Sequence, residues 1–470
     1  MYHLGRLDDK MRVTISNVIT IEDPIPKIKQ WSVDNLEMPN PEYIKKARMN
    51  LWLGRTPERI RLYEIHGNSL RLPFGVLREL IPMFKGSEII TEFVEPEKID
   101  YHSAVELYDY QKDAVEQCVS KKYGILQSPA GSGKTQMAIA MICQYSERAL
   151  WLTHTHDLLL QSKERAERYI DSSLLGTITE GKVNVGKGIT FATIQTMCKV
   201  DLAQFKDTWD VIVCDECHRI SGSPTTVTQY YKVLNALSAR HKYGLSATVH
   251  RSDGMIAATH ALIGQVIYTV PEIAVADKIM KVGIRTVGTG IGMSPEFLNS
   301  DGTLNYTSMI SWLAENEQRN QVILSELVRE KGHHCLILSD RLEHLETLMN
   351  SLPENMRSDA VMVSGKMTSK SGKRQRDGAI EAMRKGEKLY LFATYGLAKE
   401  GLDVPCLDRL FLATPQKDYA VVTQSIGRIA RTCEGKDEPI ALDFVDDILY
   451  CRKAFKARCR TYKKNNCYFD

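Results

Sequence analysis

The sequence lacks a long hydrophobic run, a marked excess of one charge and more than one closely spaced pair of cysteines. No apolar run reaches the roughly 18 residues that a membrane-spanning helix needs. Residues 1–10 do not contain the hydrophobic region of a secretory signal. We therefore expect a cytoplasmic protein, in the cytoplasm of a bacterial host if the chain is encoded by a phage, with no membrane partner.

Charge and cysteine content narrow the possible ligands and the cellular compartment of the protein. The 61 basic and 58 acidic residues leave a net charge of only +3, so any binding of nucleic acid must depend on local basic patches. The 11 cysteines are odd in number and scattered, which is typical of reduced thiols in a cytosol. Cys214 and Cys217 form the only C-x-x-C pair, and no second pair lies at zinc-binding spacing. We expect no metal site built from cysteine.

The length of 470 residues predicts about three domains. Residues 11–21 alternate in the manner of strands, whereas apolar runs alternate with helical stretches from about residue 105, as in a parallel α/β sheet. A second alternating block begins near 315, after a less regular stretch. The predicted parts are an N-terminal accessory domain (1–104), a first lobe (105–275), a linker (276–312), a second lobe (313–450) and a basic tail (451–470).

A glycine-rich loop, Ser-Pro-Ala-Gly-Ser-Gly-Lys-Thr at residues 128–135, lies between an apolar run and a stretch of helix formers. This is the context of a P-loop, in which backbone N–H groups at a helix N-terminus cradle phosphates. Lys134 would reach the β- and γ-phosphates, and the Thr135 hydroxyl would hold Mg²⁺. Ser128 replaces the usual first glycine. The loop predicts ATP as the ligand.

Two acids follow the apolar run 211–214. Asp215 is placed to hold Mg²⁺ through water, and Glu216 is placed to polarise the water that attacks the γ-phosphate. Adjacent acids can also form a simple surface turn, but their position after a buried strand, downstream of a P-loop, favours the catalytic interpretation.

The order of these motifs resembles superfamily 2 helicases from about residue 105 to 450. It runs from Gln111 through the P-loop, the Asp-Glu-Cys-His box at 215–218 and Ser-Ala-Thr at 246–248 to Gln-Ser-Ile-Gly-Arg-Ile-Ala-Arg at 424–431. Residues 244–254 and 317–320 are similar to the XPB-like DNA helicases. The resemblance implies an α/β fold of two tandem RecA-like parallel-sheet domains plus a small N-terminal α+β accessory domain, with ATP and Mg²⁺ between the lobes.

The resemblance also assigns roles to single residues. Gln111 would recognise adenine, although Tyr108 replaces an arginine of that motif. Arg428 and Arg431, three apart on an expected helix, would reach the γ-phosphate together with Gln424. Ser246 and Thr248 would couple hydrolysis to strand movement. The remaining nucleotide contacts would come from Ser128, Pro129, Ala130, Gly131, Ser132, Gly133, Lys134, Thr135, Gly401 and Asp403.

Contacts with nucleic acid are expected in two places. The resemblance places Thr153, His154, Thr193, Gln195 and Thr394 along the nucleic-acid backbone. Residues 45–62 are basic with Trp52 interleaved, which suits phosphates and a stacking base and nominates Arg55, Arg59 and Arg61. The alternative is a solvated basic face with Trp52 in the core. Parts of residues 40–75 are also similar to phage recombination helicases of the UvsW type, which implies branched DNA as substrate.

We therefore predict an ATP-dependent DNA helicase or translocase, monomeric, with single-stranded, forked or branched DNA as its partner. An RNA helicase is the first alternative, and Ala430, where RNA helicases of the DEAD-box type carry glycine, favours DNA. A duplex-DNA translocase of a larger complex is the second; residues 401–404 read Gly-Leu-Asp-Val rather than the Gly-Leu-Asn-Leu of remodelling motors. A binding module that has lost catalysis is disfavoured, because the lysine, the acids and the arginines are all present.

Overall fold

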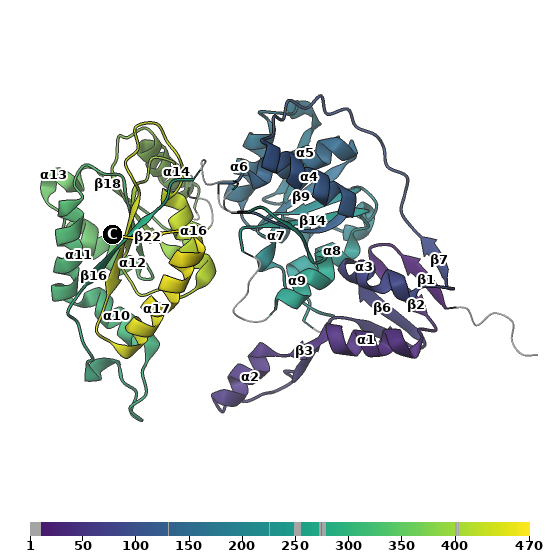
Figure 1. Cartoon of the computed structure of the whole chain (residues 1–470), viewed down its shortest axis with the longest axis horizontal. Coiled ribbons are helices and arrows are strands. Elements are labelled where there is room, and N and C mark those ends of the chain that lie inside the picture. The colour runs from purple at the N-terminus through teal and green to yellow at the C-terminus, as the bar shows by residue number, and fades with distance from the viewer. Residues whose placement is uncertain are drawn as a thin grey trace, which may run out of the picture. The chain divides into compact units, whose positions relative to one another are not determined.

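The chain folds into two units, Met1–Pro271 and Glu272–Asp470, in the computed structural model (Figure 1). The structure describes residues 11–129, 131–224, 226–248, 255–271, 274, 279–365, 367, 369–399, 402 and 404–470. Within these residues, no helix combines the length and the apolar character needed to cross a bilayer.

Unit 1 begins with a small sheet whose strands run in the order β5-β6-β2-β1-β7. Its strands are β1 (Arg12–Ile15), β2 (Val18–Glu22), β5 (Glu64–His66), β6 (Ser69–Pro73) and β7 (Glu88–Thr91). Helix α1 (Pro26–Leu36) contributes Ile28 and Leu36 to the buried core, and α3 (Leu77–Leu80) follows β6 after a short 3₁₀ turn. The sheet and helices form the expected small α+β domain.

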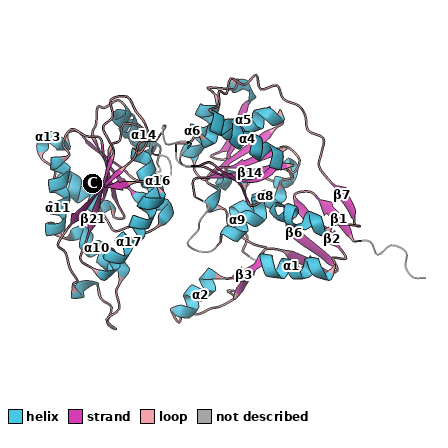
Figure 2. Ribbon diagram, in the orientation of Figure 1, coloured by secondary structure: helices cyan, strands magenta, loops and turns pink. Residues whose placement is uncertain are grey.

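A narrow arm leaves this domain after α1. It begins in β3 (Glu37–Pro39), continues through α2 (Pro41–Arg48) and a loop, and returns in β4 (Arg59–Arg61), which pairs with β3 in antiparallel fashion. Figure 2 shows α2 standing apart from the small sheet. No residue of α2 is buried.

The small domain shares its core with the rest of unit 1. Phe74 packs in one cluster with Tyr123 and Ala258, which belong to the larger sheet and to α9 (Ile256–Ile263). Gly75 permits this contact, because a Cβ atom there would lie 2.4 Å from the His260 carbonyl oxygen. The N-terminal domain is thus fixed to the first lobe rather than tethered to it.

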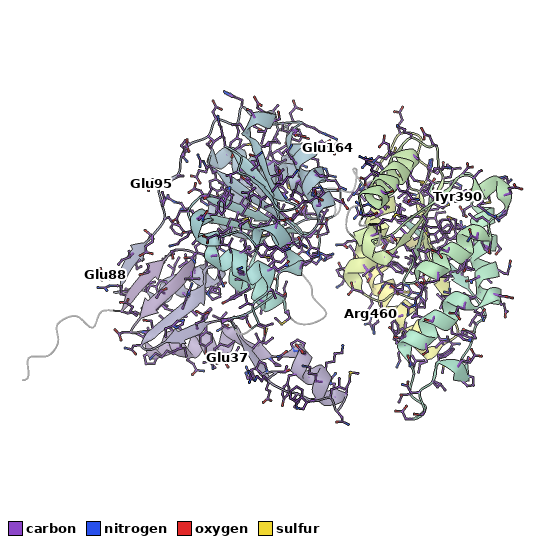
Figure 3. The ribbon with its side chains drawn as sticks, turned by 180° about the vertical axis from the view of Figure 1, so that it is seen from behind. Glu37, Glu88, Glu95, Glu164, Tyr390 and Arg460 are labelled. Carbon is purple, nitrogen blue, oxygen red and sulfur yellow. The ribbon has the colours of Figure 1, made fainter. Side chains whose placement is uncertain are left out.

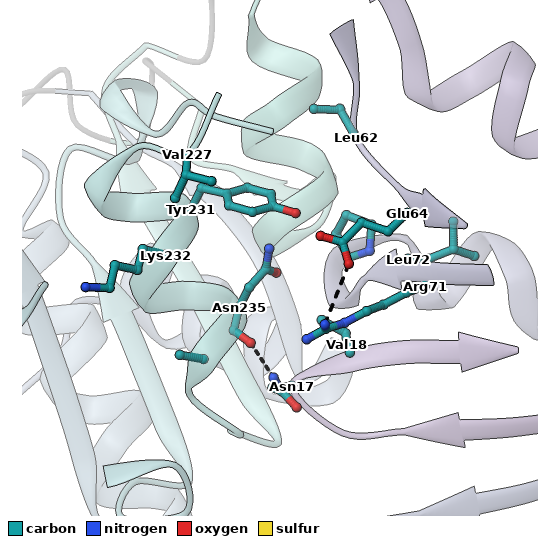
Figure 4. Close-up of a pocket in the computed structure, with 12 residues that line it drawn as sticks. Asn17, Val18, Leu62, Glu64, Arg71, Leu72, Val227, Tyr231, Lys232 and Asn235 are labelled. Carbon is teal, nitrogen blue, oxygen red and sulfur yellow. Dashed lines mark hydrogen bonds and ion pairs between the residues drawn. The ribbon is translucent and has the colours of Figure 1, made fainter. Parts of the chain in front are cut away.

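A cavity of about 260 Å³ lies where the small sheet meets α8 (Gln229–Ala236) (Figure 4). Asn17 donates a hydrogen bond across this contact to the Asn235 carbonyl. Glu64 and Arg71 form an ion pair of 3.6 Å on the side of the small sheet. The contact between the two parts of unit 1 is therefore apolar at Phe74 and polar along this seam.

The larger sheet of unit 1 has the order β11-β10-β12-β9-β13-β14-β8-β15, parallel except for the β10–β11 pair. The strands are β8 (Tyr123–Gln127), β9 (Ala149–Thr153), β10 (Leu175–Thr179), β11 (Lys182–Asn184), β12 (Ile189–Thr193), β13 (Val211–Cys214), β14 (His241–Ser246) and β15 (Val266–Thr269). β9, β12, β13 and β14 are buried throughout, which explains the apolar runs of β9 and β13, whereas β14 also buries the polar His241 and Lys242. The remaining helices are α4 (Asp109–Lys121), α5 (Lys134–Tyr145), α6 (His156–Ala166) and α7 (Ile194–Met197).

Unit 2 contains a second parallel sheet, ordered β18-β19-β17-β20-β21-β16-β22. Its strands are β16 (Gly283–Gly288), β17 (Cys335–Ser339), β18 (Ala360–Val363), β19 (Tyr390–Thr394), β20 (Arg409–Leu412), β21 (Ile440–Val445) and β22 (Tyr468–Phe469). Its helices are α10 (Tyr306–Glu315), α11 (Glu317–Arg329), α12 (Leu342–Asn350), α13 (Glu354–Arg357), α14 (Lys370–Arg384), α15 (Tyr395–Lys399), α16 (Tyr419–Ile429) and α17 (Leu449–Lys464). The predicted fold class, two parallel α/β domains with a small N-terminal domain, is confirmed.

Two segments differ from the predicted organisation. β16 lies within the predicted linker 276–312, yet it pairs along its whole length with β21. The predicted tail contains most of α17, whose Tyr462 is fully buried and whose Arg458 binds Asp443 of β21. The glycines at both ends of β16 and the many basic residues of α17 make the two segments resemble a linker and a tail in the sequence. Their burial comes from contacts with β21, which the local sequence does not show. The other predicted boundaries stay predictions.

The buried His344 of α12 makes unit 2 sensitive to acid. Its Nδ1 lies 3.0 Å from the Ser339 hydroxyl and its Nε2 lies 2.9 Å from Oδ1 of Asn320, so the neutral ring satisfies both partners. Burial, together with the nearby Arg319, lowers the pKa of His344 from 6.5 to about 3. Between these values the unfolded state binds more protons than the folded state, so stability falls as the pH falls.

We expect the free energy of unfolding of unit 2 to drop by up to about 1.4 kcal/mol per pH unit below pH 6.5, and His344→Gln to flatten this slope. Hydrogen exchange at the amides of β17 in urea, measured between pH 7 and pH 4.5, reports the stability of this unit. His102→Gln, at an exposed histidine, is the matched control. An unchanged slope in His344→Gln would contradict the assignment.

Candidate nucleotide-binding site

The predicted motifs of unit 1 gather at one edge of its large sheet. Gln127 at the end of β8 pairs with Ser246 at the end of β14, and Thr153 of β9 pairs with Thr193 of β12. β13, which precedes the acidic pair, lies between β14 and β9. Because parallel strands end at the same edge, the residues that follow them lie side by side. This edge carries residues 128–135, 153–154, 193–195, 215–218 and 246–248.

The loop between β8 and α5 has the backbone of a phosphate-binding turn. Gly131 and Gly133 have φ values of 83° and 80°, a region that glycine enters without strain, and Gly133 caps the N-terminus of α5. A Cβ atom on Gly133 would lie 2.4 Å from Nε2 of Gln111, so the two residues approach as closely as a glycine allows. Ala130 lies outside the described residues.

Helix α4 holds this loop from one side. Gln111 is almost fully buried, and its Nε2 donates to the Ser132 carbonyl at 2.9 Å. Tyr110 donates to the same carbonyl at 3.0 Å. The Gln111 side-chain oxygen accepts from the backbone N–H of Tyr108 at 3.0 Å, which caps α4. Gln111 therefore positions the loop, in addition to the adenine contact that the resemblance predicts.

Hydrogen bonds inside the loop keep its shape. The hydroxyls of Ser128 and Ser132 bond to each other, and the Ser132 hydroxyl is 2.7 Å from the Pro129 carbonyl. Lys134 donates to the Ser128 carbonyl at 3.3 Å, a long and half-buried contact. Ser128, in place of a glycine, thus takes part in the loop by its side chain. The weakly held ammonium of Lys134 is available to a phosphate.

The acidic pair follows β13 directly. Asp215 is buried and accepts a hydrogen bond of 3.0 Å from the backbone N–H of Glu216. Burial and the neighbouring Glu216 raise the pKa of Asp215, whereas Lys134 opposes the rise. The lysine of the loop thus acts electrostatically on the acid that follows β13. Glu216 has a φ of 49°, an unusual conformation for a residue with a side chain.

The donor set at this edge suits Mg²⁺, which prefers oxygen ligands. The Asp215 carboxylate and the Thr135 hydroxyl both belong to residues that are nearly buried. Arg165 of α6 donates to the Thr135 hydroxyl at 3.3 Å. This arginine was not predicted, and nothing in its local sequence separates it from the other basic residues of α6.

His218 connects the acidic pair to the motif at 246–248. His218 lies 3.2 Å from the Glu216 carboxylate and 3.0 Å from the Ser246 hydroxyl. The Ser246 hydroxyl accepts from the backbone N–H of Thr248 at 3.2 Å, and its carbonyl accepts from the Ser128 N–H at 3.0 Å. Ser246 thus contacts both the phosphate loop, at Ser128, and the Asp-Glu-Cys-His box, at His218. His218 belongs to the Asp-Glu-Cys-His box but had no predicted role.

The predicted nucleic-acid residues of the strand ends differ in accessibility. Thr153 and Thr193 are buried, so their side chains shape the edge rather than line its surface. Gln195 and His154 are half-buried and joined, because Nε2 of Gln195 donates to the His154 carbonyl at 2.6 Å. Thr394 is half-buried at the end of β19 in unit 2.

The basic run of the arm separates into two groups. Arg59 and Arg61 both form ion pairs with Glu37, of 3.5 and 2.9 Å, so one of their two charges is balanced at the base of the arm. Arg55 is exposed in the loop. Trp52 is 88% exposed, which rules out the alternative that places it in the core.

In unit 2, Gln424 and Arg428 lie on α16. Gln424 is buried, and Arg428 donates to the carbonyls of Ala398 and Leu402 at 2.8 and 2.9 Å. Arg431 lies beyond the end of α16 and forms an antiparallel bridge with residue 279. The prediction that both arginines share a helix face is therefore wrong, because the helix ends at residue 429. Gly401 and Asp403 lie outside the described residues.

Comparisons with known proteins identify two domains in the chain. The family model of the Type III restriction enzyme res subunit matches residues 104–251. The model of the helicase conserved C-terminal domain matches residues 318–433. The first match covers the sheet edge described above, and the second covers α11 to α16.

Three relatives span most of the chain. A protein of Acanthamoeba polyphaga mimivirus, provisionally named as an ATP-dependent RNA helicase, is 28% identical over 73% of this chain and 64% of its own length. The DNA 3'-5' translocase XPB2 of Sulfurisphaera tokodaii is 24% identical over 72% and 81%. The ATP-dependent DNA helicase UvsW of phage T4 is 21% identical over 73% and 69%. A crystal structure of T4 UvsW aligns with 98% of both chains at 18% identity and a TM-score of 0.42. This chain thus spans slightly less than two thirds of the mimivirus protein.

Proposed function

Given that the chain belongs to superfamily 2 of the ATP-dependent helicases and is similar to XPB and UvsW, we propose that it is a DNA helicase or translocase. Its proposed substrates are forked or branched DNA in replication, recombination or repair. We place it in the cytoplasm, that of a bacterial host if a phage encodes it, and expect it to act as a monomer. Sequence relatives named as DNA helicases and translocases in a phage and an archaeon support this choice.

The observation that carries the proposal is that the predicted motifs of unit 1 lie together at one edge of its large sheet. Lys134, in the loop after β8, and Asp215, directly after β13, both lie at this edge, and His218 there links Glu216 to Ser246. The same edge continues to His154 and Gln195, which the resemblance places along the nucleic acid. A nucleotide site and a candidate strand-binding surface thus share one rigid layer, as a motor requires.

The residues of unit 1 divide the chemistry among them. Backbone N–H groups of the loop and Lys134 bind the phosphates of ATP. Thr135 and Asp215 hold the Mg²⁺ ion, which neutralises charge on the phosphate oxygens. Glu216 orients and polarises the attacking water. His218 and Ser246 transmit the state of this acid to the strand-end residues.

Unit 2 is proposed to supply the cations that stabilise the transferred phosphoryl group. Arg428 and Arg431 carry this role, with Gln424 beside them and Gly401 and Asp403 contributing further contacts to the nucleotide. The charge of an arginine at such a position is worth roughly 10³- to 10⁵-fold in rate. In support, the buried Gln424 side-chain oxygen has no hydrogen-bond partner within the described residues, as expected of a group that awaits a ligand.

A panel of substrates tests the proposed function. ATP hydrolysis and strand separation are measured with single-stranded DNA, forks, four-way junctions, R-loops and RNA. We expect stimulation by DNA and unwinding of forked or branched substrates in preference to blunt duplexes. Stimulation by RNA and not by DNA would overturn the proposal.

Two alternatives have specific support. The mimivirus relative, named as an RNA helicase, favours RNA as a substrate, and the RNA arm of the panel decides this. The match to a restriction-enzyme subunit favours a motor that moves along duplex DNA without opening it. Such a motor would displace a third strand from a triplex yet fail to unwind a fork.

A further inference from the structure

The arm of unit 1, residues 40–58, exposes a group of apolar side chains at its tip. Trp52 is 88% exposed, and Met49 and Leu51 are 58% and 52% exposed. Ile44 of α2 is exposed on the same arm, at 37%. Because α2 buries no residue of its own, the arm contributes little to the core of the protein. The exposure of these apolar side chains to water is therefore unfavourable, and the side chains do not stabilise the core.

The arm is nevertheless a fixed structure. The Asn40 side chain donates to the Pro57 carbonyl at 2.8 Å, and its backbone N–H donates to the Glu58 carbonyl at 2.9 Å. Lys46 of α2 donates to the Thr56 hydroxyl at 2.8 Å, which ties the helix to the returning strand. Figure 3 shows Glu37 at the base of the arm, where it pairs with both arginines of β4.

The Trp52 ring packs against the backbone of Gly54. A Cβ atom at residue 54 would lie 2.8 Å from the six-membered ring of Trp52, and Gly54 has a φ of 53°. The ring thus lies against the glycine backbone, which supports it while most of its surface stays open. An aromatic ring that is held and exposed can receive a flat partner without losing conformational freedom.

Exposed cations lie on the same arm as this ring. Lys45, Arg48 and Arg55 are exposed, and none of them has an ion-pair partner among the described residues. Of the acids on the arm, Glu42 is paired with Lys46 at 2.7 Å, which leaves Glu58 near the base. An arm that carries both an exposed aromatic ring and free cations is complementary to a base and its phosphates.

We propose that Trp52 stacks on a nucleobase at the point where the two strands of a fork or junction separate, and that Lys45, Arg48 and Arg55 contact the adjoining phosphates. The inference rests on the proposed function, since it takes DNA as the substrate. Stacking is tolerant of sequence, which suits an enzyme that moves along DNA. The absence of free acids near the tip disfavours a basic protein partner.

The test measures the affinity of the full-length protein for a fork that carries 2-aminopurine at its junction, at several salt concentrations. Trp52→Ala should weaken fork binding roughly 5- to 100-fold without changing the salt slope, because it removes stacking and no charge. Trp52→Phe should keep part of the affinity. Arg55→Gln should weaken binding and reduce the salt slope by about 1. The fluorescence of 2-aminopurine should respond to the wild type and not to Trp52→Ala.

Two matched controls come from the same domain. Ile65→Ala removes an apolar side chain that is 59% exposed, and Lys27→Gln removes an exposed charge on α1. Neither should alter fork binding. Circular dichroism and thermal midpoints verify that each variant is folded.

Several outcomes would overturn the inference. The inference is overturned if a folded Trp52→Ala protein binds the fork as tightly as the wild type does. It is also overturned if Trp52→Ala weakens binding to blunt duplex DNA as much as it weakens binding to the fork. Self-association of the wild type that Trp52→Ala abolishes, with fork binding intact, would make the arm a protein interface. A fork of RNA bound in preference to DNA would reassign the ligand. Failure of the proposed function itself would appear differently, as a wild-type ATPase that no DNA stimulates.

Discussion

Replacing Lys134 with alanine should lower the nucleic-acid-stimulated ATPase rate by roughly 10²- to 10³-fold, because the ammonium stabilises charge that develops on the transferred phosphoryl group. The fold should survive, since within the part of the chain that the structure describes Lys134 makes a single long hydrogen bond, to the Ser128 carbonyl at 3.3 Å. Losing such a bond costs about 1 kcal/mol at most. The rate is measured with saturating single-stranded DNA, and the thermal midpoint of the same preparation verifies folding.

Two variants make this result specific. Lys134→Arg keeps the charge but changes its shape, so it should recover little activity at a site fitted to a compact ammonium. Lys182→Ala removes an exposed lysine from β11, at the far edge of the same sheet, and should hydrolyse ATP at the wild-type rate. Full activity in Lys134→Ala would show that the loop is not the nucleotide site.

Replacing Arg458 with methionine should destabilise unit 2 by roughly 3–5 kcal/mol, because it leaves a buried carboxylate without its partner. Arg458 makes two hydrogen bonds to Asp443, of 2.8 and 2.6 Å, and both side chains are at most 2% exposed. A third bond, of 2.6 Å, reaches the Gln416 carbonyl. The carboxylate holds the pKa of Arg458 above its usual value despite burial, so the guanidinium stays charged. Hydrogen exchange at β21 in urea measures the loss.

The control lies on the same helix. Arg460 is an exposed arginine of α17 (Figure 3), and Arg460→Met should change stability by no more than about 0.5 kcal/mol. The double variant Arg458→Met/Asp443→Val removes both charges and should regain much of the stability, limited by Tyr462, whose hydroxyl then loses its bond to Asp443. Equal effects of Arg458→Met and Arg460→Met would contradict the buried ion pair.

Several parts of the site could be read from local sequence. Gly131, Gly133 and Lys134 form a phosphate loop because a turn with positive φ that leads into a helix requires glycine at fixed places. The acidic pair could be recognised for a related reason, since β13 is buried on both faces and so leaves an unbroken apolar run before the first polar residue. Such signals lie within a few residues of one another.

Local sequence could not show which side chains meet across the fold. Gln111 lies against Gly133, 22 residues away, and His218, next to Glu216, contacts Ser246, 28 residues away. Arg431 was expected on α16, but the helix ends before it. Helix ends depend on capping and on tertiary contacts, and the bridge to residue 279 is such a contact.

The amino-acid sequence alone determined the two parallel sheets, the nucleotide motifs and their order along the chain. These depend on periodicity and turn chemistry, which act over short distances. Only the tertiary structure decided which basic residues are free for DNA. Arg59 and Arg61 share a sequence run with Arg55, yet the first two are both paired with Glu37 from the neighbouring strand. The sequence around Trp52 fits a core residue and a stacking platform equally well, and its exposure goes with an arm whose helix α2 has no buried residue. Burial is a property of what surrounds a residue, and the surroundings come from distant parts of the chain.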